Sequence, residues 1–294
     1  MEQKNEPKAL GMLLLSMTIF GTIGLFRRLI DLPSSFIAFS RGLVGAVFIA
    51  AVLLARHRRF AWEAMRGCWW RVLLSGALLG FNWILMFEAY RFTTVSVATL
   101  CYYMAPVIVV LLSPLVLRER LDRRRVVFVA IAVLGMLLVS GVLGSRVQGV
   151  KGVLLSLCAA CFYAAIVLLN KSVRGVPGLD KTLVQMAACA VVLLPYVLLT
   201  EPVATLAFTP ESVLLLLVVG AVHTGLCYAL YFGSMDGLRA QTVALASYVD
   251  PVVAVATSAL FLNEHMTALQ WIGAVLVIAA TMAGELLPER SEKA

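Results

Sequence analysis

The chain has 294 residues, of which 62% are hydrophobic and 14% are charged, and its mean hydropathy is +0.96. An ordinary globular domain carries about 25% charged residues, so this much apolar surface excludes a soluble fold. The net charge of +8 does not indicate a nucleic-acid partner, because the basic residues lie in short clusters between apolar runs. The composition predicts a membrane protein.

Ten apolar segments along the chain predict transmembrane helices, each long enough to cross roughly 30 Å of hydrocarbon. The expected spans are 9–26, 33–55, 70–90, 93–117, 125–144, 149–170, 179–200, 211–233, 239–262 and 267–287. Turn residues such as Asp31 and Pro33 stand between them, and no connection is long enough for a soluble domain. The first apolar run lacks a cleavage site of small residues and is expected to be a retained span.

The basic residues are distributed unequally between the two sides that these spans define. Of the 24 Lys and Arg residues, 18 lie on the side that holds both termini. The other side has Arg27, Arg28, Arg91, Arg146 and Lys151, and Arg41 lies within a span. The positive-inside rule therefore predicts a multi-pass protein of the cell membrane with both termini in the cytoplasm.

An internal repeat appears when the sequence is compared with itself at an offset of 145 residues. Residues 80–121 align with residues 225–266 without a gap, and 12 of the 42 positions are identical. The identities include Tyr103 with Tyr248, Pro106 with Pro251 and Glu119 with Glu264. Each half then contains five spans, and because five is odd the second half crosses the membrane in the opposite direction. Inverted repeats of this kind are typical of secondary transporters.

The two halves share a proline followed thirteen residues later by glutamate, in residues 98–121 and again in residues 244–266. With Gly152 opening the sixth span, the chain resembles the drug/metabolite transporter superfamily, in particular its EamA-type members. The resemblance covers essentially the whole chain. It implies an all-α membrane protein of ten transmembrane helices, with a first EamA-like five-helix repeat in residues 1–145 and a second in residues 146–294. It also implies transport of a small metabolite, and it leaves both cargo and direction open.

Asp250 is the first candidate for the substrate site, because a carboxylate in mid-membrane costs roughly 2.5 to 3.5 kcal/mol unless it faces the protein interior. The alternative is a structural ion pair or hydrogen bond. Next to it, Pro251 removes one backbone donor, which predicts a kink, and Pro106 occupies the matched position in the first half. We expect both prolines to shape the helices and to permit bending of a gate.

Arg41 is the one basic residue inside a span, and two roles compete for it. It could bind an anionic group of the substrate with two parallel hydrogen bonds, or it could reach outward and pair with Glu88. His223 could relay protons, although a single membrane histidine more often forms a hydrogen bond across helices. Of the aromatic residues that could line a cavity, Tyr103, Tyr248 and Trp83 are the main candidates, against helix packing as the alternative.

Glu119 and Glu264 are expected to end two helices on opposite sides of the membrane, where capping or gating suits them better than substrate binding. Gly76 and Gly80 present a small-residue face that permits close helix packing, or at most a homodimer contact. Cys158 and Cys161 form a C-x-x-C spacing inside an apolar span, where packing is the expected role and no disulfide is predicted.

Sequence motifs of other functional classes do not occur in the chain. There is no H-E-x-x-H, G-x-S-x-G or nucleotide-binding motif, so we expect neither an enzyme nor an ATP-driven pump. No cofactor and no metal site is expected. The leading hypothesis is amino-acid-like efflux by alternating access, with a small-molecule substrate, the lipid bilayer and a coupling proton or ion as partners. The alternatives are an importer or exchanger of a nucleotide-derived metabolite, a non-transporting sensor or scaffold, and a membrane enzyme.

Overall fold

A computed structural model describes residues 6–105, 107–109, 112, 123–139, 149–173, 175–235, 246 and 249–286 of the chain. These residues form helices and connecting turns, with no strand among them. The helices are α1 (Glu6–Gly21), α2 (Ile23–Leu29), α3 (Ser34–Ala55), α4 (Trp62–Arg66), α5 (Trp69–Phe92), α6 (Val95–Tyr102), α8 (Arg123–Val139), α9 (Val150–Lys171), α10 (Gly178–Thr200), α11 (Pro210–Gly220), α12 (Cys227–Met235), α14 (Val249–Phe261) and α15 (Ala268–Leu286). A 3₁₀ turn covers Val203–Thr205, and a π-helix, Ala221–Leu226, joins α11 to α12.

Six helical stretches are long and apolar enough to cross a membrane: Pro7–Leu29, Ser34–Ala55, Trp69–Phe92, Val150–Asn170, Gly178–Thr200 and Pro210–Ser234. Shorter apolar helices lie at Val95–Val109, Ala130–Val139, Val249–Phe261 and Ala268–Ala280. Each falls on one of the predicted spans, and the ends of the six long stretches differ from the predicted ends by a few residues. The prediction of an all-helical membrane protein is therefore confirmed.

Several helices begin at residues that cap them. The Thr94 hydroxyl accepts a hydrogen bond from the Val97 N–H and so caps α6. Thr209 caps α11 in the same way through the Ser212 N–H, and Pro210 follows at the first helical position, where its missing N–H costs nothing. These caps explain why apolar segments begin as helices at these threonines.

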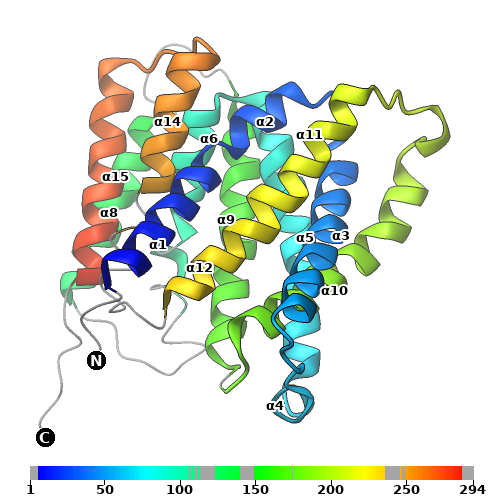
Figure 1. Ribbon diagram of the computed structural model, residues 1–294. Coiled ribbons are helices and arrows are strands. Elements are labelled where there is room, and N and C mark those ends of the chain that lie inside the picture. The colour runs from blue at the N-terminus through cyan, green and yellow to red at the C-terminus, as the bar shows by residue number, and fades with distance from the viewer. Residues whose placement is uncertain are drawn as a thin grey trace, which may run out of the picture.

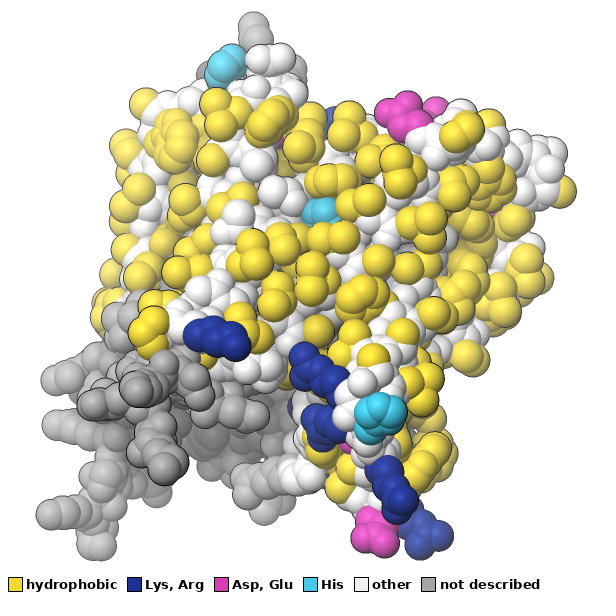
Figure 2. Space-filling model, viewed as in Figure 1, with side chains coloured by type: hydrophobic (Ala, Val, Ile, Leu, Met, Phe, Trp, Pro, Cys, Tyr) yellow, Lys and Arg dark blue, Asp and Glu magenta, His cyan; other side chains and the backbone are white. Residues whose placement is uncertain are grey.

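The surface of the bundle is apolar over its middle. Figure 2 shows hydrophobic side chains across the central part of one face, with basic side chains at its lower edge near α4. Large hydrophobic residues are strongly exposed there and elsewhere, including Leu199, Leu54 and Leu260 at 86%, 76% and 75%. A soluble monomer rarely exposes apolar surface on this scale, and a surrounding bilayer accounts for it.

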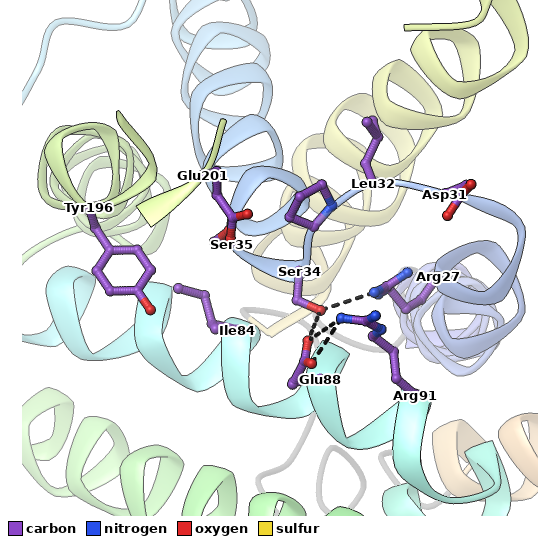
Figure 3. A pocket seen from close by; sticks show the side chains of 11 residues that line it. Arg27, Asp31, Leu32, Ser34, Ser35, Ile84, Glu88, Arg91, Tyr196 and Glu201 are labelled. Atoms are coloured by element: carbon purple, nitrogen blue, oxygen red, sulfur yellow. Dashed lines mark hydrogen bonds and ion pairs between the residues drawn. The ribbon is translucent and has the colours of Figure 1, made fainter. Parts of the chain in front are cut away.

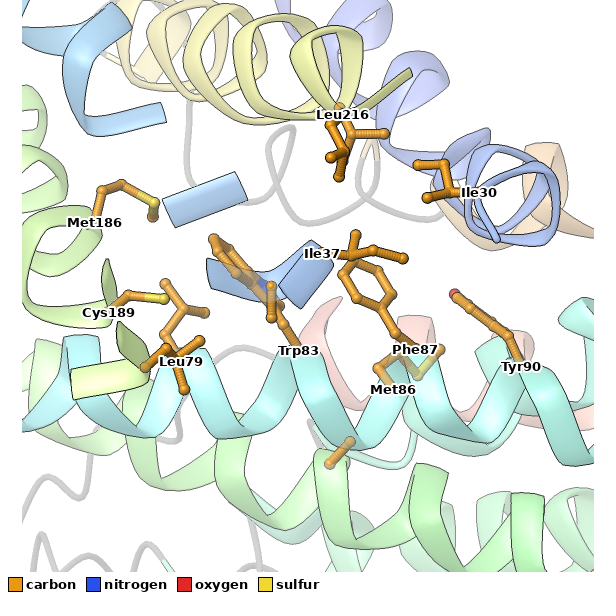
Figure 4. Packing of buried hydrophobic residues seen from close by; sticks show 14 of the residues in the cluster. Ile30, Ile37, Leu79, Trp83, Met86, Phe87, Tyr90, Met186, Cys189 and Leu216 are labelled. Carbon is orange, nitrogen blue, oxygen red and sulfur yellow. The ribbon is translucent and has the colours of Figure 1, made fainter. Parts of the chain in front are cut away.

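The core lies around α5, which packs against α9 on one side and against α3 and α10 on another. Figure 4 shows Trp83 and Phe87 projecting from α5 toward Ile37 of α3 within the largest hydrophobic cluster. Gly76 permits the contact with α10, because a Cβ added there would lie 2.4 Å from the Gln185 carbonyl oxygen. The predicted small-residue face is therefore a contact inside the chain.

The two ends of the bundle differ in the groups that they present. The start of α1, the end of α15 and α4 lie at one end, here named the α4 end (Figure 1). The end of α2 and the loop after α14 lie at the opposite end, here named the Glu264 end. This arrangement agrees with the distribution of basic residues in the sequence, because Arg27 and Arg28 lie at the Glu264 end.

Candidate functional site

Two helix irregularities meet in the middle of the bundle. The first span is interrupted at Thr22, between α1 and α2, and the eighth contains the π-helix Ala221–Leu226. The Thr22 hydroxyl and the His223 Nε2 atom are 2.9 Å apart and form a hydrogen bond between these two irregular segments. Short π segments inside α-helices are frequent at functional sites. His223 thus forms a hydrogen bond across helices.

Arg41 is buried on α3, facing the same π-helix. Its side chain is 5% exposed, and its Nε donates a hydrogen bond of 2.7 Å to the Thr224 hydroxyl. The guanidinium carbon lies 4.0 Å from the centre of the Trp83 ring and 5.9 Å from that of Phe87. These rings cover the cation with their faces, a favourable arrangement that is stronger away from water.

Of the two roles considered for Arg41, pairing with Glu88 is not what the structure shows. No carboxylate in the described part of the chain lies within 4.0 Å of the Arg41 nitrogens. Glu88 instead pairs with Arg91 at 3.0 Å and accepts a hydrogen bond of 2.7 Å from the Ser34 hydroxyl. Arg41 therefore stays inside the bundle.

Asp250 lies in the first turn of α14 and forms a side-chain hydrogen bond with Tyr103, the residue that ends α6. The position is favourable for a carboxylate because the N-terminus of a helix carries partial positive charge. Arg41 also acts on this carboxylate electrostatically, although the two are not ion-paired. A guanidinium and a carboxyl group thus lie in one region of the helix bundle.

Gly21 brings α1 against this region. A Cβ added at Gly21 would lie 2.6 Å from the backbone oxygen of Asp250 and 2.7 Å from the Cβ of Val253. Any larger side chain would force α1 and α14 apart. The glycine therefore lets the first helix of the chain form one wall of the Asp250 site.

Glu264, in the loop after α14, contacts residues of the first half of the chain. Its carboxylate pairs with Arg28 at 3.0 Å, accepts a hydrogen bond of 2.8 Å from the Val95 N–H, and accepts another from the Ser258 hydroxyl. Arg28 in turn donates to the Thr93 carbonyl at 2.8 Å. These contacts link α2 and α6 to the end of α14.

A polar pocket of about 470 Å³ opens at the Glu264 end, between the α2–α3 turn, α5 and the end of α10. Figure 3 shows Arg27, Ser34, Glu88 and Arg91 joined by hydrogen bonds along one wall. Sequence reasoning did not predict this pocket. Although Arg27 and Arg91 were placed on this side, nothing in the sequence indicated that they would lie close together.

Of the remaining predicted site residues, the structure describes Pro251 but not Tyr248, Pro106 or Glu119. Pro251 is buried in the first turn of α14, where a missing N–H is tolerated, and the predicted kink stays untested. Sequence reasoning missed Thr22 and Thr224, because isolated threonines in apolar spans carry no signal of their own. Within the described residues, no group of His, Cys, Asp and Glu could hold a metal ion.

Comparison with known proteins identifies the family. The model of the EamA-like transporter family matches residues 7–141 and again residues 150–283. The chain belongs to the EamA-like transporter family. The resemblance inferred from the repeated proline and glutamate is thereby confirmed, and this EamA-like transporter is a multi-pass membrane protein.

Individual relatives of this EamA-like transporter carry transporter names. The uncharacterized transporter YxxF of Bacillus subtilis (strain 168) is 29% identical over 282 residues, covering 94% of this chain and 89% of the relative. A probable amino-acid metabolite efflux pump of Salmonella typhimurium (strain LT2) is 28% identical over 180 residues, covering 57% of this chain and 60% of the relative. A solved crystal structure shares the fold with a TM-score of 0.68 and 20% identity, covering 95% of this chain and 97% of the other.

Proposed function

We propose that this EamA-like transporter is a secondary transporter that exports a small, amino-acid-like zwitterion across the cell membrane by alternating access. The observation that carries the proposal is the placement of Arg41 and Asp250. Both lie inside membrane-spanning helices and within electrostatic reach of each other, yet they do not form an ion pair. A buried guanidinium without a carboxylate partner at this depth is costly unless a ligand or another group complements its charge.

A zwitterionic substrate would complement both charges. Its carboxylate would accept hydrogen bonds from the Arg41 guanidinium, whose planar arrangement of donors matches a carboxylate. Its ammonium group would lie toward the Asp250 carboxylate, beside the Tyr103 hydroxyl. The Trp83 ring covers the guanidinium and would exclude water from this contact. His223 lies in the same π-helix as Thr224, which accepts the hydrogen bond from Arg41.

The topology that we propose is ten transmembrane helices in two inverted repeats, residues 1–145 and 146–294. The two separate family matches support it, as does the repeated sequence pattern. Both termini lie in the cytoplasm according to the distribution of basic residues. The Glu264 end is then extracytoplasmic, and the Arg28–Glu264 ion pair links the two repeats where an outward-facing cavity would open.

The outward direction and the substrate class draw support from one relative. The Salmonella protein is named a probable amino-acid metabolite efflux pump, and it matches part of this chain. Absence of a nucleotide-binding motif in the sequence favours transport coupled to an ion gradient or to exchange. Matched prolines and glutamates, Pro106 with Pro251 and Glu119 with Glu264, are proposed to permit the bending and closing of the two gates.

The test is transport in proteoliposomes loaded with unlabelled amino acids, with entry of radiolabelled amino acids measured as counterflow. We expect saturable counterflow of at least one neutral amino acid, and a loss of at least tenfold in Asp250→Asn and in Arg41→Gln. Glu211→Gln is the matched control, because Glu211 is an exposed carboxylate in the first turn of α11. Counterflow that survives both site variants, or saturable binding without any flux, would contradict the proposal.

A further inference from the structure

A second cavity lies at the α4 end, on the outer surface of the bundle and away from the Arg41 and Asp250 site. It has a volume of about 550 Å³ and hydrophobic walls, and is here named the α10 groove. Its lining includes Phe60, Trp62 of α4, Leu73 of α5, and Leu183, Ala187 and Val191 of α10. The groove follows α10 from residue 183 to residue 191, which is roughly 12 Å at 1.5 Å per residue. This length and the apolar lining suit part of a hydrocarbon chain.

Basic residues adjoin two of the lining residues, Phe60 and Trp62, along the chain. Arg56, Arg58 and Arg59 precede Phe60 directly, and all three side chains are exposed. Arg66 of α4 is also exposed, whereas the one carboxylate within α4 is that of Glu63. None of these four arginines takes part in an ion pair within the described residues. Exposed arginines without ion-pair partners among the described residues therefore lie next to the lining residues Phe60 and Trp62 in the chain.

The segment between α3 and α4, which contains these arginines, is fixed by contacts with α10. His57 adopts a positive φ of 49°, which turns the chain sharply after α3. The backbone N–H of Ala61 donates a hydrogen bond of 3.0 Å to the buried carboxylate of Asp180, in the first turn of α10. Phe60 and Trp62 pack against each other with ring centres 4.5 Å apart. The basic cluster and the apolar groove are thus fixed to the same helix.

The depth of the groove places it in one leaflet. Trp62, Trp69 and Trp70 are exposed by 73%, 55% and 50%, and exposed tryptophans mark the level of the lipid headgroups. The groove begins at this level and extends toward the middle of the bilayer along α10. A lipid bound here would have its headgroup at the level of these tryptophans and its acyl chain along α10.

We propose that the α10 groove binds an anionic phospholipid, with one acyl chain in the groove and the phosphate against Arg56, Arg58 and Arg59. The charge complementarity is specific, because basic side chains at this depth attract the anionic lipids of a leaflet. A second copy of the chain is a poorer occupant. A two-fold axis at the groove would bring these arginines close to the same arginines of the partner. Gly76, the other candidate for a dimer contact, is already covered by α10.

The test is native mass spectrometry of the purified, delipidated protein mixed with equal amounts of phosphatidylglycerol and phosphatidylethanolamine. We expect the wild-type protein to retain phosphatidylglycerol preferentially. Arg56→Gln, Arg58→Gln and Arg59→Gln together are expected to lower the phosphatidylglycerol-bound fraction at least tenfold. Ala187→Phe fills the groove without changing the charge, and it is expected to lower binding of both lipids. Lys8→Gln is the control, because it removes an exposed cation from α1, which does not form the groove.

Three results would overturn the proposal. The first is equal retention of the two lipids by the wild-type protein. The second is unchanged phosphatidylglycerol binding in the triple variant, with a thermal melting curve that shows it to be folded. The third is a dimer that Ala187→Phe dissociates, which would make a second copy the occupant. This experiment measures lipid binding and not counterflow, so its result does not depend on the proposed transport function.

Discussion

The carboxylate of Glu264 accepts a hydrogen bond of 2.8 Å from the backbone N–H of Val95, so a side chain that follows α14 completes the first turn of α6. The first N–H groups of a helix have no partner within the helix, and buried ones need a partner from elsewhere. The same carboxylate also pairs with Arg28. One side chain of the second half therefore serves as both helix cap and ion-pair partner for the first half.

Replacing Glu264 should separate these two roles. Glu264→Gln keeps an oxygen acceptor for the Val95 N–H and loses the ion pair, which is worth about 0.2–1 kcal/mol at a partly exposed site. Glu264→Ala also loses the cap, at a further cost of about 1 kcal/mol. We expect the melting temperature in detergent to fall further for Ala than for Gln. Glu211→Ala, at an exposed carboxylate, should leave it unchanged, and equal losses in the two Glu264 variants would refute the capping role.

Exchanging the charges of Arg28 and Glu264 is a second test of the ion pair and the cap. Arg28→Glu alone places two carboxylates together and should destabilise the protein and impair transport. The double variant Arg28→Glu with Glu264→Arg should recover part of this loss, since the ion pair returns but an arginine cannot accept the Val95 N–H. The measurement is the melting temperature and counterflow of all three variants. Full recovery in the double variant would show that the cap contributes nothing.

Thr224 should contribute to stability through its hydroxyl. Thr224→Val has nearly the same shape but removes the acceptor for the Arg41 Nε, which is then left without this partner inside the bundle. A buried donor without a partner costs about 1–3 kcal/mol. We expect a lower melting temperature for Thr224→Val and a smaller change for Thr224→Ser, which retains the hydroxyl. A valine variant as stable as the serine variant would argue against the hydrogen bond.

Gly21 should tolerate no side chain. Gly21→Ala places a Cβ 2.6 Å from the Asp250 backbone oxygen, so α1 or α14 has to shift. Overpacking of this kind costs about 1–3 kcal/mol, and the shift would also disturb Asp250 itself. We expect loss of stability and of counterflow. Gly11→Ala on the same helix is the matched control, because a Cβ there meets nothing within 4 Å. Similar behaviour of the two variants would contradict the close approach.

The helices could be predicted from the sequence because hydropathy and chain length determine them locally. The expected spans 33–55 and 179–200 correspond to α3 and α10, which begin and end within a residue of these limits. The interruption at Thr22 and the π-helix were not predictable in this way. Each is stabilised by contacts with a distant part of the chain, as the bond from Thr22 to His223 shows.

The candidate site was predicted in part. Charge inside an apolar span pointed to Arg41 and Asp250; Arg41 is buried on α3, and Asp250 is partly buried in the first turn of α14. The choice between the two roles of Arg41 could not be made from the sequence, for a physical reason. Depth along two helices can be judged from the sequence, but the direction of a side chain around its helix cannot. Glu88 points to Arg91 and Ser34, whereas Arg41 points to Trp83.

The π-helix marks a difference between the two aligned sequence segments, 80–121 and 225–266, and the residues just before them. At the offset of 145 residues, His223 and Thr224 correspond to Leu78 and Leu79, which lie in an uninterrupted α-helix within the largest hydrophobic cluster. Thr224 binds Arg41, and Trp83, whose counterpart is Tyr228, covers it. An interior with perfect two-fold symmetry would accept an elongated ligand equally well in either of two opposite orientations. Because the polar pair His223 and Thr224 aligns with two leucines, the interior contacts of the two aligned segments are chemically unlike, and a ligand bound between them would meet a different group at each of its ends.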